Sequence, residues 1–386
     1  MAPLMGAALA LLAARGAAAQ ITQASREAVI GCALPLSGPE SQVGWRVLRG
    51  VLIAARAFDE GGPGFPLAVA VRDTGGTPEG AQRAVADLVE KEGVVAIVGP
   101  VTSRESPGAA TAAQARRVPI VTLTQREDVL KTGDFVFRAI LTPRDEAQAV
   151  ALYAANALHL SRLGVLYPDE PFGRDLARAF SEAAASSNAK VIRASTYKRP
   201  ADLPNAMDRV LDQHPGATTP PRVEGIFVPD TAEAARVVAA RLGLAGAKDV
   251  WLLGTSLWNT PESLVGGMLE GAVLAAAFTT ESRRATTHAF VSEYRRTFGE
   301  DPDAFAAQAH DVTVLLLDLL REEPGAGRER IRWRLQNASL YDGAAGTIRF
   351  EGQRDAHRGS FVLGVRRGRM VPLEEADLPP GPGAFP

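Results

Sequence analysis

The residues that could carry acid–base or metal chemistry are few and scattered along this chain. Its five histidines are His159, His214, His288, His310 and His357. No two of them have the spacing of metal ligands on one helix. The string GTSLW at 254–258 lacks the final glycine of a nucleophile elbow, and no glycine-rich loop ends in Gly-Lys-Ser/Thr. The sequence therefore gives no reason to expect catalysis, a metal or a cofactor.

Two loops in the first half of the chain offer groups that could bind a ligand. Ser37 supplies a hydroxyl and Gly38 allows close approach of the backbone, although a plain turn explains both residues equally well. Thr102 and Ser103 precede a helical pattern, and Thr102 with Glu105 fits a capping box. Free amides at that helix start favour an anionic group such as a carboxylate, whereas capping alone would also explain these residues.

A third loop has the sequence TLTQR and ends at Arg126. Its polar members are Thr122, Thr124, Gln125 and Arg126. The guanidinium group of Arg126 could hold a carboxylate through two parallel hydrogen bonds, or it could block the pocket.

The second half of the chain adds polar and aromatic residues directly after predicted strands. They are Tyr167, Asp169 and Phe172 in LYPDEPFG, Asp230 in VPD, and Ser256 with Trp258 in GTSLWN. An aromatic ring there could cover the apolar part of a ligand, but packing explains Trp258 and Phe172 at least as well. Asp230 also suits the N-cap of the helix that begins near Ala232.

Strands and helices must bring these loops together, and the chain alternates between the two. Apolar runs predict strands at 29–34, 66–73, 94–100, 118–123, 162–168, 190–197, 223–229, 249–254 and 271–278. Helical patterns lie between them at 47–55, 78–91, 105–116, 174–186, 203–211 and 232–241. This alternation predicts an α/β protein with two doubly wound halves, each with a parallel sheet. Ligands bind such sheets beyond the carboxyl ends of their strands.

The end of the chain departs from this alternation. Helical segments at 286–298, 304–321 and 328–336 precede strands at 346–350 and a hairpin at 359–371. Helices this late indicate a chain that returns to the first half and then crosses back. Residues 375–386 contain the string LPPGPGAFP, whose composition predicts disorder.

Composition sets broad limits on function. Of the 386 residues, 46% are hydrophobic and 22% are charged, which is an ordinary globular composition. The chain is long enough to form two hydrophobic cores. With 42 Lys and Arg against 44 Asp and Glu, the net charge is −2. The chain therefore lacks the positive field that binds nucleic acid, and we expect no nucleic-acid partner.

Residues 1–19 have the pattern of a signal peptide. An apolar core from Leu4 to Ala14 precedes Ala17, Ala19 and Gln20, although no Lys or Arg comes before it. We expect an exported, periplasmic bacterial protein whose mature chain has no membrane span, because no later apolar run reaches the required ~20 residues. The only cysteine, Cys32, ends a formal lipoprotein cleavage box. Cleavage there would destroy the first strand, so we expect a buried structural thiol.

Six strings resemble, in order, those of type I periplasmic solute-binding proteins of the branched-chain amino acid (Leu/Ile/Val) class, which serve ABC transporters. They are LPLSGPESQVGWRVLRGVLIAA, AIVGPVTSRESPGAA, VLYPDEPFGRDLARAF, GTSLWN, EGAVLAAAF and DAFAAQAHDVTVLLL. Together with the strands between them they cover nearly all of residues 28–371.

The resemblance implies a two-lobed clamp with a three-strand hinge that closes on a ligand in its cleft. Lobe 1 would comprise 28–140 and 279–338, and lobe 2 would comprise 141–278 and 339–374. The implied protein is a monomeric binder without catalysis. Its partners would be a small amino acid, amide or carboxylate and a membrane permease. Ser103 falls on a ligand-binding serine of the family.

The sequence departs from this family at two places. Where amino acid binders have a Ser-Pro-small-Ala-Thr pattern, this chain has TLTQR, with Gln125 and Arg126 in the last two positions. Val43 stands where close amino acid binders have an aromatic residue, and Trp45 follows two positions later. Both changes weaken the expectation that leucine or its relatives are the ligand.

Alternative functions share the same fold. The departures also fit the domain of lipoprotein activators of penicillin-binding proteins, an interaction module whose cleft has lost amino acid binding. The sensor domain of a receptor is a third hypothesis, disfavoured by the lack of a membrane segment. A LacI-type repressor is excluded by the leader, which stands in place of a DNA-binding headpiece.

Overall fold

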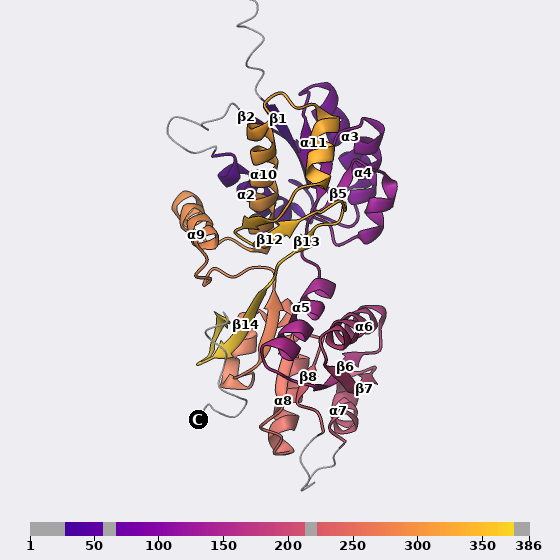
Figure 1. Ribbon diagram of the computed structural model, residues 1–386, viewed down its shortest axis with the longest axis vertical. Helices are drawn as coiled ribbons and strands as arrows, with labels where there is room; N and C mark the ends of the chain where they lie inside the picture. The colour runs from indigo at the N-terminus through magenta and orange to yellow at the C-terminus, as the bar shows by residue number, and fades with distance from the viewer. Residues whose placement is uncertain (1–27, 57–66, 213–221, 374–386) are drawn as a thin grey trace, which may run out of the picture. The chain divides into compact units, whose positions relative to one another are not determined.

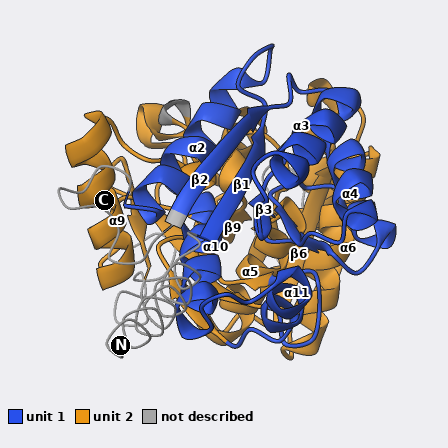
Figure 2. Ribbon diagram, turned by 90° about the horizontal axis from the view of Figure 1, so that it is seen from above, with its two compact units in different colours: residues 1–139, 308–339, 350–356 blue, residues 140–307, 340–349, 357–386 orange. Residues whose placement is uncertain are grey.

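The computed structural model describes residues 28–56, 67–212 and 222–373 (Figure 1). The predicted signal peptide and the predicted disordered tail lie outside the described residues. By the contacts among its residues the chain divides into two units, coloured in Figure 2. Unit 1 comprises 1–139, 308–339 and 350–356, and unit 2 comprises 140–307, 340–349 and 357–386.

These units differ from the expected lobes in where the chain changes over. The sequence predicts that the chain returns from lobe 2 to lobe 1 between residues 278 and 279, whereas residues up to Ala307 share most of their contacts with unit 2. A short segment, 350–356, also belongs to unit 1. The units are groups of mutually contacting residues, so the lobe boundaries stay predictions.

Unit 1 is built on a five-stranded parallel sheet in the order β2-β1-β3-β4-β5. Its strands are β1 (Ala28–Leu34), β2 (Leu67–Asp73), β3 (Ala96–Val98), β4 (Ile120–Thr122) and β5 (Val136–Arg138). The first strand pairs with β2 on one side and with β3 on the other. The direction of the sheet order therefore reverses at β1, which is where such sheets bind ligands.

Helices cover both faces of this sheet, α2 on one and α3 with α4 on the other (Figures 1 and 2). The helices of unit 1 are α2 (Ser41–Ala54), α3 (Pro78–Glu90), α4 (Ser106–Ala115), the 3₁₀ helix η1 (Glu127–Thr132) and α11 (Arg328–Gln336). α10 (Ala304–Glu322) begins in unit 2 and continues in unit 1. Thr77 caps α3 by accepting a hydrogen bond from the Gly80 amide at 3.1 Å, and Pro78 suits the first helical position.

Unit 2 contains a seven-stranded sheet in the order β15-β14-β10-β9-β8-β6-β7. Its parallel members are β6 (Arg162–Pro168), β7 (Lys190–Tyr197), β8 (Gly225–Phe227), β9 (Trp251–Gly254) and β10 (Val273–Ala276). The predicted C-terminal hairpin is confirmed as β14 (Phe361–Arg366) and β15 (Arg369–Pro372), which join beside Arg367 and Gly368. Short strands β11 (Tyr341–Gly343), β12 (Gly346–Arg349) and β13 (His357–Arg358) form a separate sheet.

The helices of unit 2 include two packed pairs. The helices are α5 (Pro143–Asn156), α6 (Pro171–Ser186), η2 (Pro200–Asp202), α7 (Leu203–Leu211), α8 (Ala232–Leu244), η3 (Ser256–Trp258), η4 (Pro261–Gly267) and α9 (Ala285–Phe298). α5 packs on α6, and α7 packs on α8. In the core Phe180 of α6 stacks on Phe227 of β8, with ring centroids 4.3 Å apart. Such a pair adds about 1 kcal/mol to the burial of its area.

Cys32 lies in the middle of β1 and has no accessible surface. It is paired with Val71 of β2 and Val98 of β3. Burial raises the pKa of its thiol to about 12, so the thiolate is disfavoured at neutral pH. These features fit the buried structural thiol that the sequence favoured.

Candidate functional site

Asp73, at the end of β2, holds the loops that follow β1 and β2 together. Its Oδ1 accepts hydrogen bonds from the amides of Leu36, Ser37 and Gly75 at 2.9, 3.2 and 2.8 Å. Burial alone would raise the pKa of Asp73, but these amides and the Ser37 hydroxyl lower it below its usual value. Ser37 is exposed and its hydroxyl interacts with the Asp73 carboxylate, while Gly38 has a φ of +80° that suits glycine.

The two hydrogen bonds of the predicted capping box join Thr102 and Glu105, but they lie in the turn before α4, whose N-cap is Glu105 without a side-chain cap. The Thr102 hydroxyl accepts from the Glu105 amide at 3.4 Å, and Glu105 Oε1 accepts from the Thr102 amide at 3.0 Å. The same oxygen accepts from Val101 at 3.3 Å, and Oε2 accepts from the Thr74 hydroxyl. Glu105 has no accessible surface. Ser103 is exposed, and its hydroxyl has no partner within the described part of the chain.

In the TLTQR loop after β4 the two threonines have structural roles. Thr122 and Thr124 have no accessible surface. Thr122 donates to the Phe137 carbonyl at 2.8 Å, and Thr124 accepts from the Arg126 amide at 3.2 Å. The carboxamide of Gln125 is exposed and has no partner among the described residues.

Arg126 is exposed and already holds a carboxylate of its own chain. Its guanidinium group contacts both oxygens of Asp128, at 2.5 and 2.9 Å. This pair shows that the side chain can make the bidentate contact expected of it. A ligand carboxylate would have to displace Asp128.

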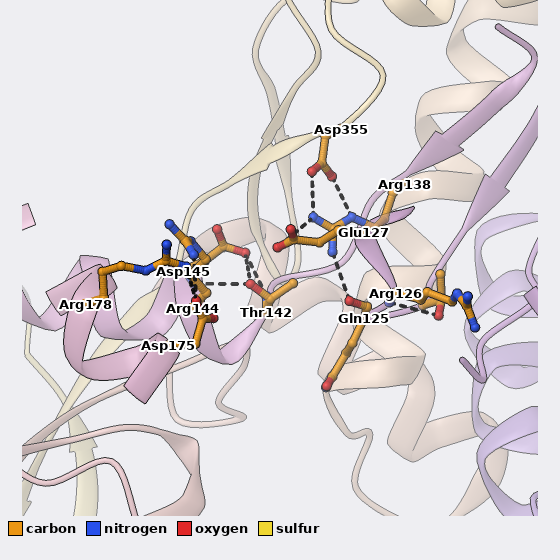
Figure 3. A network of polar contacts seen from close by, with 11 residues as sticks. Gln125, Arg126, Glu127, Arg138, Thr142, Arg144, Asp145, Asp175, Arg178 and Asp355 are labelled. Atoms are coloured by element: carbon orange, nitrogen blue, oxygen red, sulfur yellow. Dashed lines mark hydrogen bonds and ion pairs between the residues drawn. The ribbon is translucent and has the colours of Figure 1, made fainter. Parts of the chain in front are cut away.

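Arg138, at the end of β5, is a buried cation that sequence reasoning missed. Its guanidinium group makes a bidentate pair with Asp355 at 2.8 and 2.6 Å and donates to the Gln125 carbonyl at 3.3 Å (Figure 3). It thereby fixes the backbone of the TLTQR loop. No local motif marks it, because its partner lies 217 residues away.

Asp230, after β8, is held by its neighbours in unit 2. The Tyr197 hydroxyl donates to Oδ2, and the Thr231 amide donates to Oδ1 at 2.6 Å. Burial, followed by the hydrogen bond to this carboxylate, raises the pKa of Tyr197 well above its usual range. The N-cap of α8 is Thr231, which accepts from Ala234, so the capping role considered for Asp230 is wrong. The amide that Asp230 reaches belongs to Thr231, which precedes the helix, whereas an N-cap accepts from an amide of the first turn, as Thr231 does.

Trp258 is a core residue. It has no accessible surface, and its indole Nε1 donates to the Asp230 carbonyl at 2.9 Å. A Cβ atom at Gly254 would lie 2.4 Å from its ring. The packing alternative weighed for Trp258 therefore describes its position, whereas Phe172 is 41% exposed on α6. Tyr167 is partly buried and packs against the core of unit 2.

Ser256, after β9, donates two hydrogen bonds to Glu146 in the first turn of α5. Glu146 Oε2 accepts from the Ser256 amide at 2.9 Å and from its hydroxyl at 2.8 Å. Burial raises the pKa of Glu146 to about 7, and the hydrogen bonds from Ser256 only partly oppose this effect. The preceding residue, Thr255, has a fully buried hydroxyl with no partner. Sequence reasoning missed α5 and Glu146 together.

The described residues contain no group of three or more His, Cys, Asp or Glu side chains that could hold a metal ion. Within the same residues no helix has the length and hydropathy needed to cross a membrane. His310 and Asp311 form a hydrogen-bonded pair within α10, with Nδ1 and Oδ1 3.2 Å apart.

A pocket of about 500 Å³ in unit 1 lies between the end of β2 and α3. Asp73, Gly75 and Arg83 are among its lining residues, and none of the ligand residues predicted from the sequence lines it. We therefore assign no ligand to it.

Comparison with known proteins decides the family. The family model described as periplasmic binding protein matches residues 27–368, which include every strand of both units except β15. The chain belongs to this family. The resemblance found in the sequence is thereby confirmed, and the parallel sheet of unit 1 and the mostly parallel sheet of unit 2 agree with the type I fold that it implied.

Solved structures of this family share the fold. A protein assigned to a branched-chain amino acid ABC transporter of Rhodospirillum rubrum is 23% identical, with a TM-score of 0.79 over 90% of this chain and 100% of that chain. A substrate-binding protein from Desulfitobacterium hafniense, in complex with Leu, is 22% identical, with a TM-score of 0.66 and coverage of 90% and 100%. A solute-binding protein from Rhodopseudomonas palustris, in complex with 3,4-dihydroxybenzoic acid, is 16% identical, with a TM-score of 0.63 and coverage of 92% and 99%.

Among curated proteins, glutamate receptor 2.5 of Arabidopsis thaliana is 22% identical over 333 residues. The match covers 79% of this chain, which spans about a third, 35%, of the receptor.

Proposed function

We propose that the protein is the extracytoplasmic solute-binding component of an ABC importer and that it binds a small ligand without catalysis. The observation that carries this proposal is the family match over residues 27–368. The structures of similar fold that were solved with Leu and with 3,4-dihydroxybenzoic acid support an amino acid or a small carboxylate as ligand. The partner would be a membrane permease, and the location would be the periplasm.

Residues at the carboxyl edges of the two sheets are the proposed ligand contacts. In unit 1 these are Ser103, Gln125 and Arg126, whose side chains are exposed. Ser37, Thr102, Thr122 and Thr124 would act by holding loop backbone in place, because hydrogen bonds within the protein already engage their hydroxyl groups. In unit 2, Phe172 is the exposed aromatic candidate. Asp230, Tyr167 and Ser256 complete the proposed set.

A thermal-shift screen tests the proposal with amino acids, amides, small carboxylates and peptidoglycan fragments. A ligand at 100 times its dissociation constant stabilises the folded protein by about 2.7 kcal/mol, which raises the melting temperature by several degrees. We expect such a shift with at least one amino acid, amide or carboxylate. A flat response to the whole panel, with no small molecule released from the purified protein, contradicts the proposal. A shift with peptidoglycan fragments alone would favour a role in cell-wall synthesis.

A further inference from the structure

Residues 350–356 belong to unit 1 but lie in the sequence between two stretches of unit 2. Two backbone hydrogen bonds join this segment to the last residue of β5. The Arg138 amide donates to the Arg354 carbonyl at 2.9 Å, and the Ala356 amide donates to the Arg138 carbonyl at 2.8 Å. The segment therefore runs beside the end of β5, with Asp355 between the two hydrogen-bonded residues.

Asp355 acts on the TLTQR loop through Arg138. Its two carboxylate oxygens hold the buried guanidinium group of Arg138. That group donates to the Gln125 carbonyl at 3.3 Å and lies 3.9 Å from the carboxylate of Glu127 (Figure 3). Since Gln125 and Glu127 flank Arg126 in the sequence, Arg138 contacts the residue before Arg126 and the residue after it.

Arg354 holds the chain that follows this loop. Its Nη1 donates to the carbonyls of Leu130 and Gly133 at 2.7 Å each and to that of Val136 at 3.3 Å. These carbonyls belong to η1, to the residue after η1 and to β5. Hydrogen bonds from a charged donor are about twice as strong as neutral ones. Two neighbouring side chains of one distant segment therefore hold residues 125–136 at both ends.

The side chain of Arg126 has no comparable support. It is exposed, and it pairs with Asp128, which is exposed as well. A flexible arginine loses rotamer freedom when it binds a ligand, so its affinity depends on a backbone that is already in place. The groups that hold this backbone are then part of the binding site, although they lie behind the side chain that would contact the ligand.

We infer that Arg138, Arg354 and Asp355 are positioning residues for the binding of a carboxylate by Arg126. They hold the chain on both sides of Arg126, and the loss of one of them weakens binding while every proposed ligand contact is still present. This inference rests on the proposed function and concerns the same site. It assigns part of the ligand affinity of the loop after β4 to residues more than 200 positions later in the sequence.

Titration calorimetry with L-leucine and with 3,4-dihydroxybenzoate as probes tests the inference. Asp355→Asn keeps the size of the side chain and removes its charge, so each probe that binds the wild type should bind about tenfold more weakly. Asp208→Asn is the matched control, because Asp208 makes a bidentate pair with Arg241 in unit 2, at 2.9 and 2.6 Å. It should keep the wild-type affinity. Both variants should melt at a lower temperature, so a loss of affinity in Asp355→Asn alone separates positioning from stability. If Asp355→Asn does not fold, Arg354→Gln takes its place.

Hydrogen exchange of the unliganded protein gives a second measurement. The amides of residues 125–133 should exchange about tenfold faster in Asp355→Asn and in Arg354→Gln than in wild type, because the chain opens locally. In Asp208→Asn they should exchange at the wild-type rate.

Two results overturn the inference and leave the proposed function standing. One is wild-type affinity in Asp355→Asn for a probe that binds, and the other is wild-type exchange of residues 125–133 in the two variants. If neither probe and no compound of the thermal-shift panel binds the wild-type protein, the proposed function fails, and the inference fails with it.

Discussion

Three carboxylates, exposed Asp73 and buried Glu105 and Glu146, hold the loops at the sheet edges through hydrogen bonds. Asp73 and Glu105 accept hydrogen bonds from five backbone amides of unit 1, those of Leu36, Ser37 and Gly75 and those of Val101 and Thr102. Glu146 fixes the loop after β9 in the same way. These hydrogen bonds engage the loop backbone, and Ser103, Gln125 and Arg126 are the exposed polar groups of unit 1 that are proposed to contact the ligand.

Glu146 should give the protein a pH-dependent stability that a neutral residue removes. Its pKa is about 7 in the folded state against an ordinary 4.5, so the folded state binds more protons between these values. Stability from this group is therefore fully present below about pH 4.5 and is lost as pH rises through 7, by about 3 kcal/mol. Urea unfolding at pH 5 and pH 8 should show Glu146→Gln gaining stability relative to wild type at the higher pH. An equal difference between the two proteins at both pH values would contradict this assignment.

The proposed role of Arg126 predicts an effect on ligand binding that is separate from stability. Replacing it with Ala removes an exposed pair with Asp128, so the free energy of unfolding should change little. If Arg126 holds the carboxylate of the ligand, Arg126→Ala should weaken leucine binding at least tenfold. Asp128→Asn should keep or improve the affinity, because it removes the competing carboxylate. Unchanged affinity in Arg126→Ala would refute the role.

At the scale of elements, the periodic parts of the fold were predictable and the irregular parts were not. Strands 162–168 and 190–197 and helices 203–211 and 328–336 have the predicted bounds, because apolar spacing and flanking turns define them. α5 was missed, since its alanine-rich surface gives little contrast between faces. The string TPRD before it is a capping box with Asp in place of Glu or Gln, and this signal could have located the helix.

The polar contacts of the candidate site could be predicted only in part. The pairing of Thr102 with Glu105 is local, and the sequence pattern found it. Glu146 with Ser256 and Arg138 with Asp355 join residues 110 and 217 positions apart. Such pairs depend on sheet order and strand register, which one sequence without relatives does not define.

The capping box at the start of α5 should contribute measurably to stability. Thr142 Oγ1 accepts from the Asp145 amide at 3.2 Å, and Asp145 Oδ2 accepts from the Thr142 amide at 2.8 Å (Figure 3). Thr142→Ala should therefore lower the free energy of unfolding by about 1 kcal/mol. Thr111→Ala, at an exposed position inside α4, is the matched control and should change it by less than about 0.5 kcal/mol. Equal effects of the two changes in urea unfolding would show that the cap contributes nothing.

The contact between β9 and η3 gives a prediction about packing. Gly254 lets the Trp258 ring lie directly on the strand, so Gly254→Ala places a methyl group 2.4 Å from the ring. We expect a loss of about 1–3 kcal/mol from overpacking, visible as a lower melting temperature. Gly243→Ala in α8, where a Cβ atom meets nothing within 4 Å, should be neutral or stabilising. A Gly254→Ala protein as stable as wild type would contradict the packing described for Trp258.

At the scale of the whole molecule, family membership rests on a match that extends through both units. Each unit has a parallel sheet with polar residues at its carboxyl edge, and the proposed function assigns both edges to ligand binding. The two departures from amino acid binders, at Val43 and in the TLTQR loop, leave the fold unchanged, and the proposed function assigns their effect to the choice of ligand.

Titration calorimetry of the purified full chain tests the central claim most directly. The titrant is the compound that raises the melting temperature most in the thermal-shift screen. We expect it to bind saturably, with one molecule per chain. The protein should first be unfolded and refolded to release any ligand it carries. No saturable heat with any compound, after refolding to a native circular-dichroism spectrum, would contradict the claim that this protein is a solute-binding protein.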